Sequence, residues 1–521
     1  MRKFDPIELE LFKNMFTSIT EEMAAVLQRT ALSPNIKERR DFSCALFTRD
    51  GETFAQGSHI PVHLGAMPLS VQSAIQAIEF EPGDVVILND PYRGGTHLPD
   101  ITCIQPYFAG RNLCFFIANR AHHSDVGGIT PGSMPLATEI FQEGVIIPPL
   151  KLYRRSRLND EVLNLFLANV RTPEERRGDL MAQVAANSRG ARRLSEMISR
   201  YGLEKMTLYA REIQGYTEKI LRTTIKTIPD GVYEFEDYLD DDGISSRPIR
   251  IKVTLTIKGE EVTVDFTGSS EQVSGSVNAN FAVTYSAVLY VFRSLIEEDI
   301  PFNSGLMKPV RIVAPEGSVV NACFPAALAG GNVETSQRIV DVLLGALARA
   351  IPGRIPAASQ GTMNNVAFGG YHPENRMNFA YYETIGGGMG ASATLPGLSG
   401  VHSHMTNSLN TPVEALENYL PVKIRQYALR KKSGGRGKNP GGDGLIREYQ
   451  FLVPVNLTII SDRRKSRPYG LHGGQPGQPG RNLLIRKGKK KILGSKTNLK
   501  LRAGDILRIE TPGGGGYGNP G

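Results

Sequence analysis

The glycine pattern limits how this chain can fold more than any other feature of its sequence. The chain has 55 glycines, and from about residue 360 onward they dominate and leave room only for short strands. Glycine tolerates backbone angles that other residues avoid and lets segments approach closely. The segments 434–443 (GGRGKNPGGD), 473–480 (GGQPGQPG) and 513–516 (GGGG) have the composition of loops. Composition alone leaves open whether they are flexible or wrap a ligand.

The first 360 residues carry clearer helix and strand patterns. A helix is expected over 5–31, where Asp5 can cap it, Pro6 suits its first turn, and apolar residues recur at helical spacing. Further helices are expected over 67–79, across most of 172–226, and over 281–297 and 334–351. Strands are expected over 42–47 and 84–89, with hairpins that turn at 109–111 and 258–260.

Together these patterns indicate a mixed α/β (α+β) multidomain protein with a β-rich, Gly-rich C-terminal region. A chain of 521 residues is too long for one ordinary domain. The expected divisions are an N-terminal α/β region (1–170), a helical segment (171–235), a central α/β domain (236–420) and a basic β-rich region (421–521).

The net charge of +8 is unevenly distributed. Residues 421–500 hold 20 Lys and Arg against three acidic residues, while residues 1–420 have a net charge of −9. Such a basic region can meet nucleic acid, an acidic partner subunit or a nucleotide phosphate. The N-terminus lacks the apolar run of a signal peptide, and no apolar stretch reaches 18 residues. The expected location is the cytoplasm, with no membrane association. The four cysteines form no C-x-x-C pair and are expected to be buried free thiols.

Two polar clusters flank the hairpin predicted at 101–118. NDPYRGGTHLPD (89–100) contains His97 and Asp100, and NRAHHSDVGG (119–128) contains His122, His123 and Asp125. Nitrogen and carboxylate ligands suit a divalent metal, and the hairpin can bring the two clusters together. Either cluster alone also fits a hydrogen-bonded turn. Adjacent histidines on a strand point to opposite faces, so one can bind metal while the other faces substrate or a supporting carboxylate.

Other candidates carry weaker signals. His59 and His63 have helical spacing, but Pro61 between them favours a loop or extended segment, where packing and substrate contact are equally plausible. Asp41 follows two arginines, a pattern typical of a salt-bridge partner. The Gly-rich run 385–391 lacks the Lys-Ser/Thr ending of a phosphate-binding loop. His404 and Asn407, within VHSHMTNSLNTP, can line a polar pocket.

Five segments taken in order resemble the hydantoinase B/oxoprolinase family. They are GSHIPVHLGAMP, NDPYRGGTHLPDIT, NRAHHSDVGG, HMTNSLNTPVEALE and ETPGGGGYGNP, and they span residues 57 to 520. The family includes the B-type subunit of N-methylhydantoinase and 5-oxoprolinase, and the related large subunits of acetone and acetophenone carboxylases.

The resemblance implies a function in which two subunits cooperate. A hydantoinase A-like ATPase partner would bind ATP and phosphorylate a substrate oxygen. The B-type subunit would carry a divalent metal, zinc or manganese, and house the second half-reaction, the opening of a small cyclic amide such as a hydantoin, 5-oxoproline or a lactam. A metal can activate water for attack on the phosphorylated amide. This chain is expected to be inactive alone.

The resemblance also implies roles for individual residues. The metal ligands would be Asp41, His97, Asp100 and either His122 or His123. His123 or Asp125 would move protons. The residue patterns themselves, apart from the resemblance, suggest substrate contact by His59, His63, His404 and Asn407.

Two other functions compete with this hypothesis. One is a subunit of an ATP-dependent ketone carboxylase, although the modest chain length favours hydrolysis. The other is a non-catalytic protein that uses its basic region, which predicts salt-sensitive nucleic-acid binding. The basic region lacks an aromatic-interleaved platform, which argues against nucleic acid as a partner.

Overall fold

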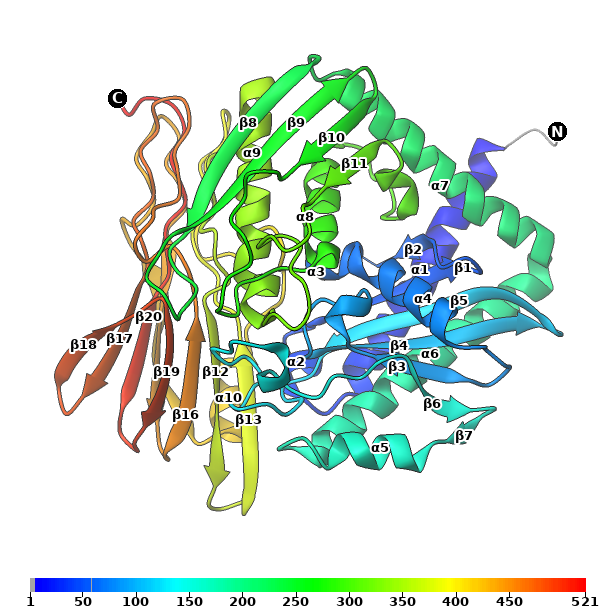
Figure 1. Ribbon diagram of the computed structural model, residues 1–521, viewed down its shortest axis with the longest axis horizontal. Coiled ribbons are helices and arrows are strands. Elements are labelled where there is room, and N and C mark those ends of the chain that lie inside the picture. Colours follow the sequence, from blue (N-terminus) through cyan, green and yellow to red (C-terminus); the bar gives the residue numbers. More distant parts are fainter. Residues whose placement is uncertain (1–4, 58) are drawn as a thin grey trace.

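The computed structural model describes residues 5–57 and 59–521, so residues 1–4 of the expected N-terminal region and residue 58 of the first family segment lie outside the described part. The expected mixture of helices and several sheets is confirmed. Figure 1 shows three groups of elements: a sheet with long helices around it, a central sheet over two helices, and a pair of sheets at the C-terminal end.

The first group is built on a seven-stranded antiparallel sheet with the order β2-β1-β5-β4-β3-β6-β7. Long helices cover one face and share a hydrophobic cluster with it, while α4 packs on the other face. The strands are β1 (Phe42–Thr48), β2 (Thr53–Gln56), β3 (Val85–Leu88), β4 (Asp100–Ala109), β5 (Asn112–His122), β6 (Leu150–Arg154) and β7 (Arg157–Leu158). The helices are α1 (Pro6–Thr30), α2 (Pro34–Lys37), α3 (Pro61–Leu64), α4 (Ala66–Ala77), α5 (Asp160–Leu167), α6 (Pro173–Tyr201) and α7 (Leu203–Lys226), with 3-10 turns η1 (Pro91–Arg93) and η2 (Ile140–Gln142).

The second group is a four-stranded sheet with the order β11-β10-β9-β8, in which only β10 and β11 run parallel. Two apolar helices, α8 and α9, pack beneath it and form the largest hydrophobic cluster. The elements are β8 (Gly231–Leu239), β9 (Ile249–Lys258), β10 (Glu261–Asp265), β11 (Val310–Val313), α8 (Phe281–Ser294) and α9 (Ser336–Ala350). A 3-10 turn η3 (Ser304–Met307) precedes β11, and a π-helical turn η4 (Gly331–Thr335) leads into α9.

The third group consists of two antiparallel sheets that share one hydrophobic cluster. Their strand orders are β13-β12-β16-β19 and β14-β15-β20-β17-β18. The elements are β12 (Asn365–His372), β13 (Met377–Glu383), α10 (Val413–Tyr419), β14 (Val422–Arg430), β15 (Gly444–Phe451), β16 (Val455–Ile460), β17 (Arg481–Arg486), β18 (Lys489–Leu493), β19 (Lys496–Leu501) and β20 (Ile506–Glu510).

A hydrophobic core and a sheet each combine segments from both sides of an expected domain boundary. Helices α6 and α7, expected as part of a separate helical segment, share a core with α1 and the first sheet. Strands β12 and β13 precede residue 420 but pair with β16, which follows it. A sheet that recruits strands from both sides of a sequence boundary cannot be recognised from local patterns, because strand pairing depends on contacts between distant segments.

The Gly-rich segments pack against one another, backbone to backbone. A Cβ atom on Gly388 would lie 2.0 Å from the carbonyl oxygen of Gly442, and one on Gly441 would lie 2.1 Å from that of Gly514. The Gly514 amide donates to Gly442 over 2.9 Å, and the Gly435 amide donates to Gly514 over 2.8 Å. These segments are therefore fixed parts of the fold, and only glycine fits at such distances.

The same packing uses the backbone amides of the run 385–391. The amides of Gly387, Gly388, Met389 and Ala391 donate to carbonyl oxygens of other segments, and the Gly390 amide donates to the Ser359 hydroxyl. A phosphate cradle needs free amides that converge on one point, so this run does not have the properties of a nucleotide site.

A buried ionic network joins the second and third groups. Arg338 on α9 contacts Asp237, Asp341 and Asp462, with N–O distances between 2.9 and 3.0 Å. Lys496 on β19 lies 3.1 Å from Asp462. The network links the two groups of elements. Separating them would leave buried charges without partners, which costs free energy. Within the part of the chain that is described, no helix has both the length and the apolar character required to cross a membrane.

Candidate functional site

Three buried side chains form a compact group of potential metal ligands. One ligand atom from each of His97, Asp100 and His122 lies within 4.8 Å of the others. His97 Nε2 is 3.4 Å from Asp100 Oδ1, and the rings of His97 and His122 meet edge to face with centroids 5.1 Å apart. All three side chains are buried.

The predicted hairpin brings these residues together. Asp100 opens β4 and His122 closes β5, and the two face each other in the strand register. Residues directly opposite in an antiparallel pair have their Cβ atoms about 5 Å apart. His97 precedes β4 in a tight turn in which Gly94 has a positive φ of 84° and the Asp100 amide donates to the His97 carbonyl over 3.1 Å.

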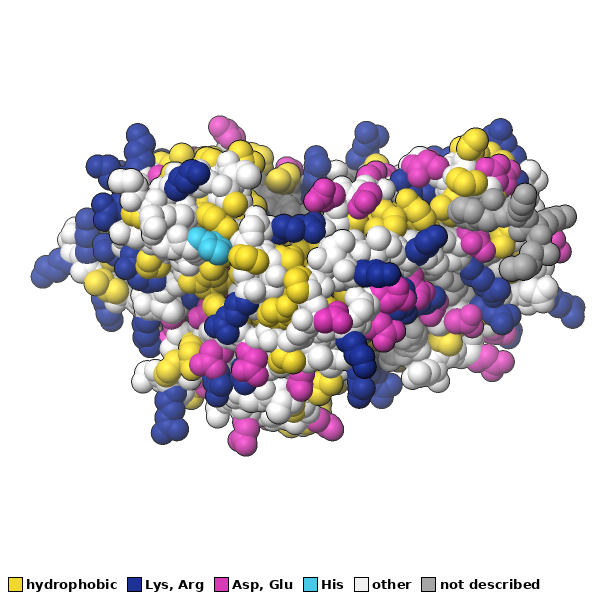
Figure 2. Space-filling model, turned by 90° about the horizontal axis from the view of Figure 1, so that it is seen from above, with side chains coloured by type: hydrophobic (Ala, Val, Ile, Leu, Met, Phe, Trp, Pro, Cys, Tyr) yellow, Lys and Arg dark blue, Asp and Glu magenta, His cyan; other side chains and the backbone are white. Residues whose placement is uncertain are grey.

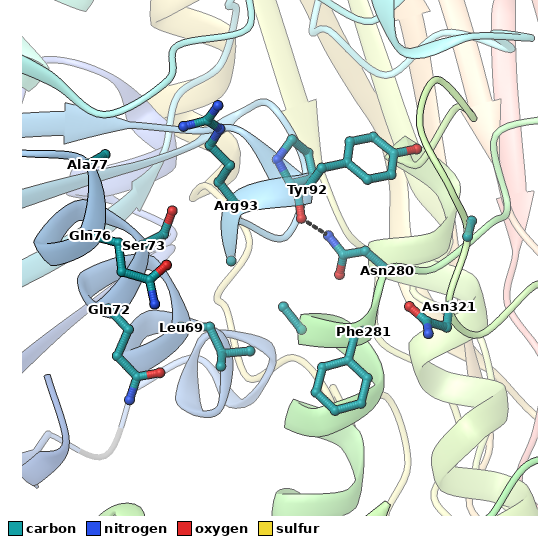
Figure 3. A pocket seen from close by; sticks show the side chains of 14 residues that line it. Leu69, Gln72, Ser73, Gln76, Ala77, Tyr92, Arg93, Asn280, Phe281 and Asn321 are labelled. Carbon is teal, nitrogen blue, oxygen red and sulfur yellow. Dashed lines mark hydrogen bonds between the residues drawn. The ribbon is translucent and has the colours of Figure 1, made fainter. Parts of the chain in front are cut away.

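Asn280, the residue that caps α8, holds the loop ahead of His97. Its side-chain amide donates to the carbonyls of Pro91, over 2.7 Å, and Gly95, over 2.9 Å. Figure 3 shows Asn280 reaching this loop beside a pocket that Arg93 and Phe281 also line. The volume of this pocket is about 620 Å³. The lining of this pocket includes Gly94 in the turn before His97, but none of the three residues of the group.

His122 and His123 project to opposite sides, as expected for neighbours at the end of a strand. His122 enters the group of three, whereas His123 Nε2 lies 3.0 Å from Gln183 Oε1 on α6. Burial lowers the pKa of His123 to about 4, and nearby Arg176 contributes to the lowering. Of the two adjacent histidines, His122 is therefore the candidate metal ligand.

Asp41 lies beside the group rather than within it. Its carboxylate is 3.5 Å from the guanidinium of Arg39, and its backbone carbonyl accepts the His122 amide over 3.0 Å. Burial raises the pKa of the Asp41 carboxyl, while the charges of Arg39 and His63 oppose that rise. Asp41 is therefore close enough to interact electrostatically with His97 and Asp100. Its backbone hydrogen bond also helps to position the strand that carries His122.

His63 contacts the other oxygen of Asp100. Its Nε2 lies 3.3 Å from Asp100 Oδ2, which also accepts a short hydrogen bond from the Thr96 hydroxyl. Burial alone would raise the pKa of Asp100, but His97 and His63 hold it well below its ordinary value. Asp100 is thus an ionised carboxylate whose Oδ2 is occupied and whose Oδ1 faces the histidines.

The residues present fit a divalent cation. Asp100 Oδ1 and His122 Nε2 are buried and have no hydrogen-bond partner among the described residues, and the same holds for His97 Nδ1, although the His97 nitrogen beside Asp100 Oδ1 is Nε2. Leaving buried polar atoms without partners is costly, and histidine nitrogen with carboxylate oxygen is a donor set that suits zinc or manganese.

The amide of Asn35 fits the same assignment. His122 Nδ1 lies 3.0 Å from Asn35 Nδ2, while Asn35 Oδ1 has no partner within the described chain. Amide oxygen and nitrogen are assigned by their surroundings. With the amide reversed, Asn35 Oδ1 accepts the Nδ1 proton of His122 and leaves the Nε2 lone pair free for a metal.

Residues from the second and third groups reach the cluster and were missed in the sequence. Asn332, on the π-helical turn η4, has its side-chain nitrogen 3.4 Å from His97 Nε2. Tyr382, on β13, stacks on His122 with ring centroids 4.5 Å apart and planes 9° apart. A π-helical turn is often found at functional sites but has no sequence signature, and nothing near Tyr382 marks it as a neighbour of a residue 260 positions away.

The four residues expected to contact substrate separate into different environments. His404 and Asn407 line a cavity of about 420 Å³ together with Pro61, Tyr290 and His402. His63 contacts Asp100, and His59 accepts the Cys44 amide over 3.2 Å at Nδ1. Burial lowers the pKa of both His402 and His404 to about 4, so the cavity presents neutral imidazoles.

The segment around Pro61 departs from the expected loop. The short helix α3 begins at Pro61 and contains His63. Proline breaks a helix in its interior but fits its first position, where the missing N–H has no partner in any case. As a result Pro61 faces the cavity while His63, two residues later, reaches Asp100.

Asp125 occupies a site with many hydrogen-bond donors. It accepts the amides of Gly127, Gly132 and Arg171 over 3.0 to 3.3 Å, and its Oδ2 is 2.9 Å from the Arg171 guanidinium. These contacts shape the turn after β5. The proton-transfer role expected for Asp125 and His123 stays a prediction, and neither residue belongs to the group of three.

The basic C-terminal region divides into buried and exposed parts. Arg447, Arg463 and Lys496 are buried in ion pairs with carboxylates. Lys489, Lys490 and Lys491 on β18 are exposed, and Figure 2 shows Lys and Arg side chains gathered at one end of the molecule. A few of the basic side chains of this region therefore stabilise the fold, while most of the Lys and Arg residues of 421–500 are exposed.

Comparison with known proteins extends the sequence resemblance to the whole chain. The chain is 44% identical over 99% of its length to the uncharacterised protein MJ0963 of Methanocaldococcus jannaschii, of which the match covers 91%. It is 43% identical to 5-oxoprolinase 1 of Arabidopsis thaliana over 99% of this chain but only 42% of that protein. The B-type subunit of a putative D-/L-hydantoinase from a Pseudomonas species is 33% identical, with 100% of this chain and 91% of that protein covered.

Two solved structures have the same fold. The ATP-dependent caprolactamase of Pseudomonas jessenii aligns with a TM-score of 0.92 at 28% identity, covering 99% of this chain and 92% of the other. An acetone carboxylase aligns with a TM-score of 0.91 at 20% identity, covering 100% of this chain and 76% of the other. The family model for hydantoinase B/oxoprolinase matches residues 5–520, and this chain therefore belongs to the hydantoinase B/oxoprolinase family.

Proposed function

We propose that this chain is the metal-binding subunit of an ATP-dependent enzyme that opens small cyclic amides, and that it works with a hydantoinase A-like ATPase subunit. The observation that carries the proposal is the buried group of His97, Asp100 and His122, with one unsatisfied atom on each residue. The names of the relatives support the reaction class, since they include 5-oxoprolinase, a B-type hydantoinase subunit and an ATP-dependent caprolactamase.

The ATP-dependent step is assigned to the partner. The chain spans 42% of the length of 5-oxoprolinase 1, so the longer protein contains a large additional part. Six of the seven backbone amides of the run 385–391 are hydrogen-bonded within the fold, so this run does not have the converging free amides of a phosphate cradle. Phosphorylation of the amide oxygen by the partner weakens amide resonance and creates a leaving group.

His97, Asp100 and His122 would hold the metal, with Asp41 as a further candidate ligand beside them. When bound, a divalent metal supplies Lewis acidity and lowers the pKa of water. His63 and Thr96 orient Asp100 through its Oδ2, so that Oδ1 remains directed toward the histidines.

The cavity lined by His404 and Asn407 is the candidate site for the amide ring. Its neutral imidazoles and the Tyr290 hydroxyl can exchange hydrogen bonds with an uncharged amide. Helix α3 borders both sites, because Pro61 lines the cavity and His63 contacts Asp100.

Co-expression with an adjacent A-type subunit tests the proposal. The purified complex should contain stoichiometric zinc or manganese and hydrolyse ATP when a hydantoin, 5-oxoproline or a lactam is added, with formation of the ring-opened product. Each subunit alone should be inactive. Turnover that depends on bicarbonate and a ketone would instead identify a carboxylase, and a metal-free complex with full activity would refute the metal site.

A further inference from the structure

Tyr382 is placed to hold the ring of His122. The two rings are nearly parallel, 9° apart, at a centroid distance of 4.5 Å, and both are buried. The guanidinium of Arg39 also lies over the Tyr382 ring, 5.0 Å from its centroid. A histidine at the end of a strand can rotate about two side-chain bonds, and a flat partner against its face limits that rotation.

The hydroxyl of Tyr382 is itself anchored. It donates to Asn365 Oδ1 over 2.7 Å, and the Asn365 nitrogen donates to Glu334 Oε1 over 2.8 Å and to the Ile460 carbonyl over 2.7 Å. Asn365 has both amide protons engaged, so its oxygen is fixed toward Tyr382. The tyrosine ring is therefore held at both its face and its end.

The same series of contacts also reaches His97. Glu334 and Asn332 both lie on the π-helical turn η4, and the Asn332 nitrogen is 3.4 Å from His97 Nε2. The path from His122 to His97 thus runs through Tyr382, Asn365, Glu334 and Asn332. All four of these residues come from the second and third groups of elements, whereas the histidines belong to the first sheet and the loop beside it.

We propose that Tyr382, Asn365, Glu334 and Asn332 form a positioning bracket that fixes the two histidine rings for metal binding, with Tyr382 as its main member. The inference rests on the metal site of the proposed function. Ligands that are already oriented lose less rotational freedom when they bind, and partners that orient a metal-binding histidine typically change metal affinity 10- to 100-fold. The bracket makes the metal centre depend on contacts between distant parts of the chain.

The neighbouring residue provides a matched control. Tyr381 is buried to the same extent as Tyr382, with 1% of its surface exposed. It points to the opposite side of β13, into the hydrophobic cluster of the C-terminal sheets, where its hydroxyl donates to Thr411 over 2.9 Å. Replacing either tyrosine removes a buried ring from the same strand, but only Tyr382 touches His122.

The test measures zinc affinity of the full-length chain by competition with a chromogenic chelator, for the wild type and for Tyr382→Leu, Tyr382→Phe and Tyr381→Leu. We expect Tyr382→Leu to weaken zinc binding by about 10- to 100-fold. Tyr382→Phe keeps the stacked ring and should retain affinity within about fivefold, and Tyr381→Leu within about threefold. The visible spectrum of the cobalt-substituted protein should change for Tyr382→Leu alone, since ligand geometry is altered there.

Thermal unfolding of the metal-free proteins separates a positioning effect from a loss of folding. If Tyr382→Leu does not fold, Asn332→Ala removes the contact to His97 without deleting a ring, and it should weaken zinc binding by about tenfold. Unchanged affinity in both Tyr382→Leu and Asn332→Ala, or an equal loss in Tyr381→Leu, would overturn the bracket. A wild-type chain that binds no zinc or manganese would refute the metal site, and the bracket with it.

Discussion

Replacing Asp125 separates two roles for a residue that the sequence marks as catalytic. In the structure Asp125 accepts three backbone amides and the Arg171 guanidinium, and it closes the turn that follows His122 and His123. A structural role predicts that Asp125→Ala destabilises this turn. A role in proton transfer predicts that the same variant loses turnover while its stability is unchanged.

The expected loss of stability follows from these contacts. Removing one partner of a buried ion pair typically costs about 3–5 kcal/mol, and Asp125 is fully buried. The Arg171 side chain keeps 28% of its surface exposed, so water can partly solvate it once the carboxylate is gone. We therefore expect Asp125→Ala to lower the free energy of unfolding by about 3 kcal/mol, at the low end of that range.

Urea unfolding at pH 7 measures this loss, with Arg171→Met and the double variant completing a cycle. The double variant should be less destabilised than the sum of the single variants, because the pair is then removed together. Zinc affinity of Asp125→Ala should stay within about threefold of the wild type, since Asp125 is outside the group of proposed ligands. An unchanged unfolding curve together with abolished turnover of the complex would refute the structural role.

Three further predictions concern the metal site, the cavity and the glycine packing. His97→Ala should reduce zinc affinity by about 100-fold or more, measured by metal analysis after dialysis, because it removes a proposed ligand itself and not only a residue that positions one. His402 and His404 have pKa values lowered to about 4 by burial. The unfolded chain binds protons at these groups near pH 6.5 while the folded chain does not, so stability should fall as the pH drops from 6.5 towards 4. At pH 5 each histidine should have lowered the free energy of unfolding by up to about 2 kcal/mol relative to neutral pH, which urea unfolding at several pH values should show. In His404→Asn the free energy of unfolding should depend less steeply on pH. Gly388→Ala places a Cβ atom 2.0 Å from the Gly442 carbonyl oxygen and should destabilise the C-terminal group by at least about 2 kcal/mol, measurable by hydrogen exchange in 434–443 and 513–516.

Local patterns predicted individual elements well. The helix over 5–31, the strand over 42–47 and the hairpin over 101–118 are seen as α1, β1 and the β4–β5 pair. Each depends on interactions between residues close in sequence: a capping aspartate and first-turn proline, a run of apolar residues, or a tight turn. The hairpin also carried the prediction that His97, Asp100 and one of the paired histidines meet, because its register is set by its own turn.

The choice between His122 and His123 needed the surrounding fold. Alternation along a strand says that the two point apart, but not which side holds His97. Packing of α6 against the sheet shows the direction of each ring, because Gln183 on that helix contacts His123 while His122 lies on the side of the cluster. That His122 rather than His123 binds a metal stays a prediction. The short helix α3 was missed for a related reason, since proline is compatible with a helix only at a start that tertiary contacts determine.

The sequence by itself determined the family, the mixed fold class and the two polar clusters, because these depend on residue types at short spacing. Tertiary structure alone decided how the glycines are used: segments that have the composition of loops are fixed by close backbone packing between stretches of chain far apart in sequence. It also decided that Tyr382 and Asn332 reach the histidines, since their contacts join residues more than 200 positions apart. The spacing of residues in the sequence does not predict such contacts, because they form only when separate hydrophobic cores pack against one another.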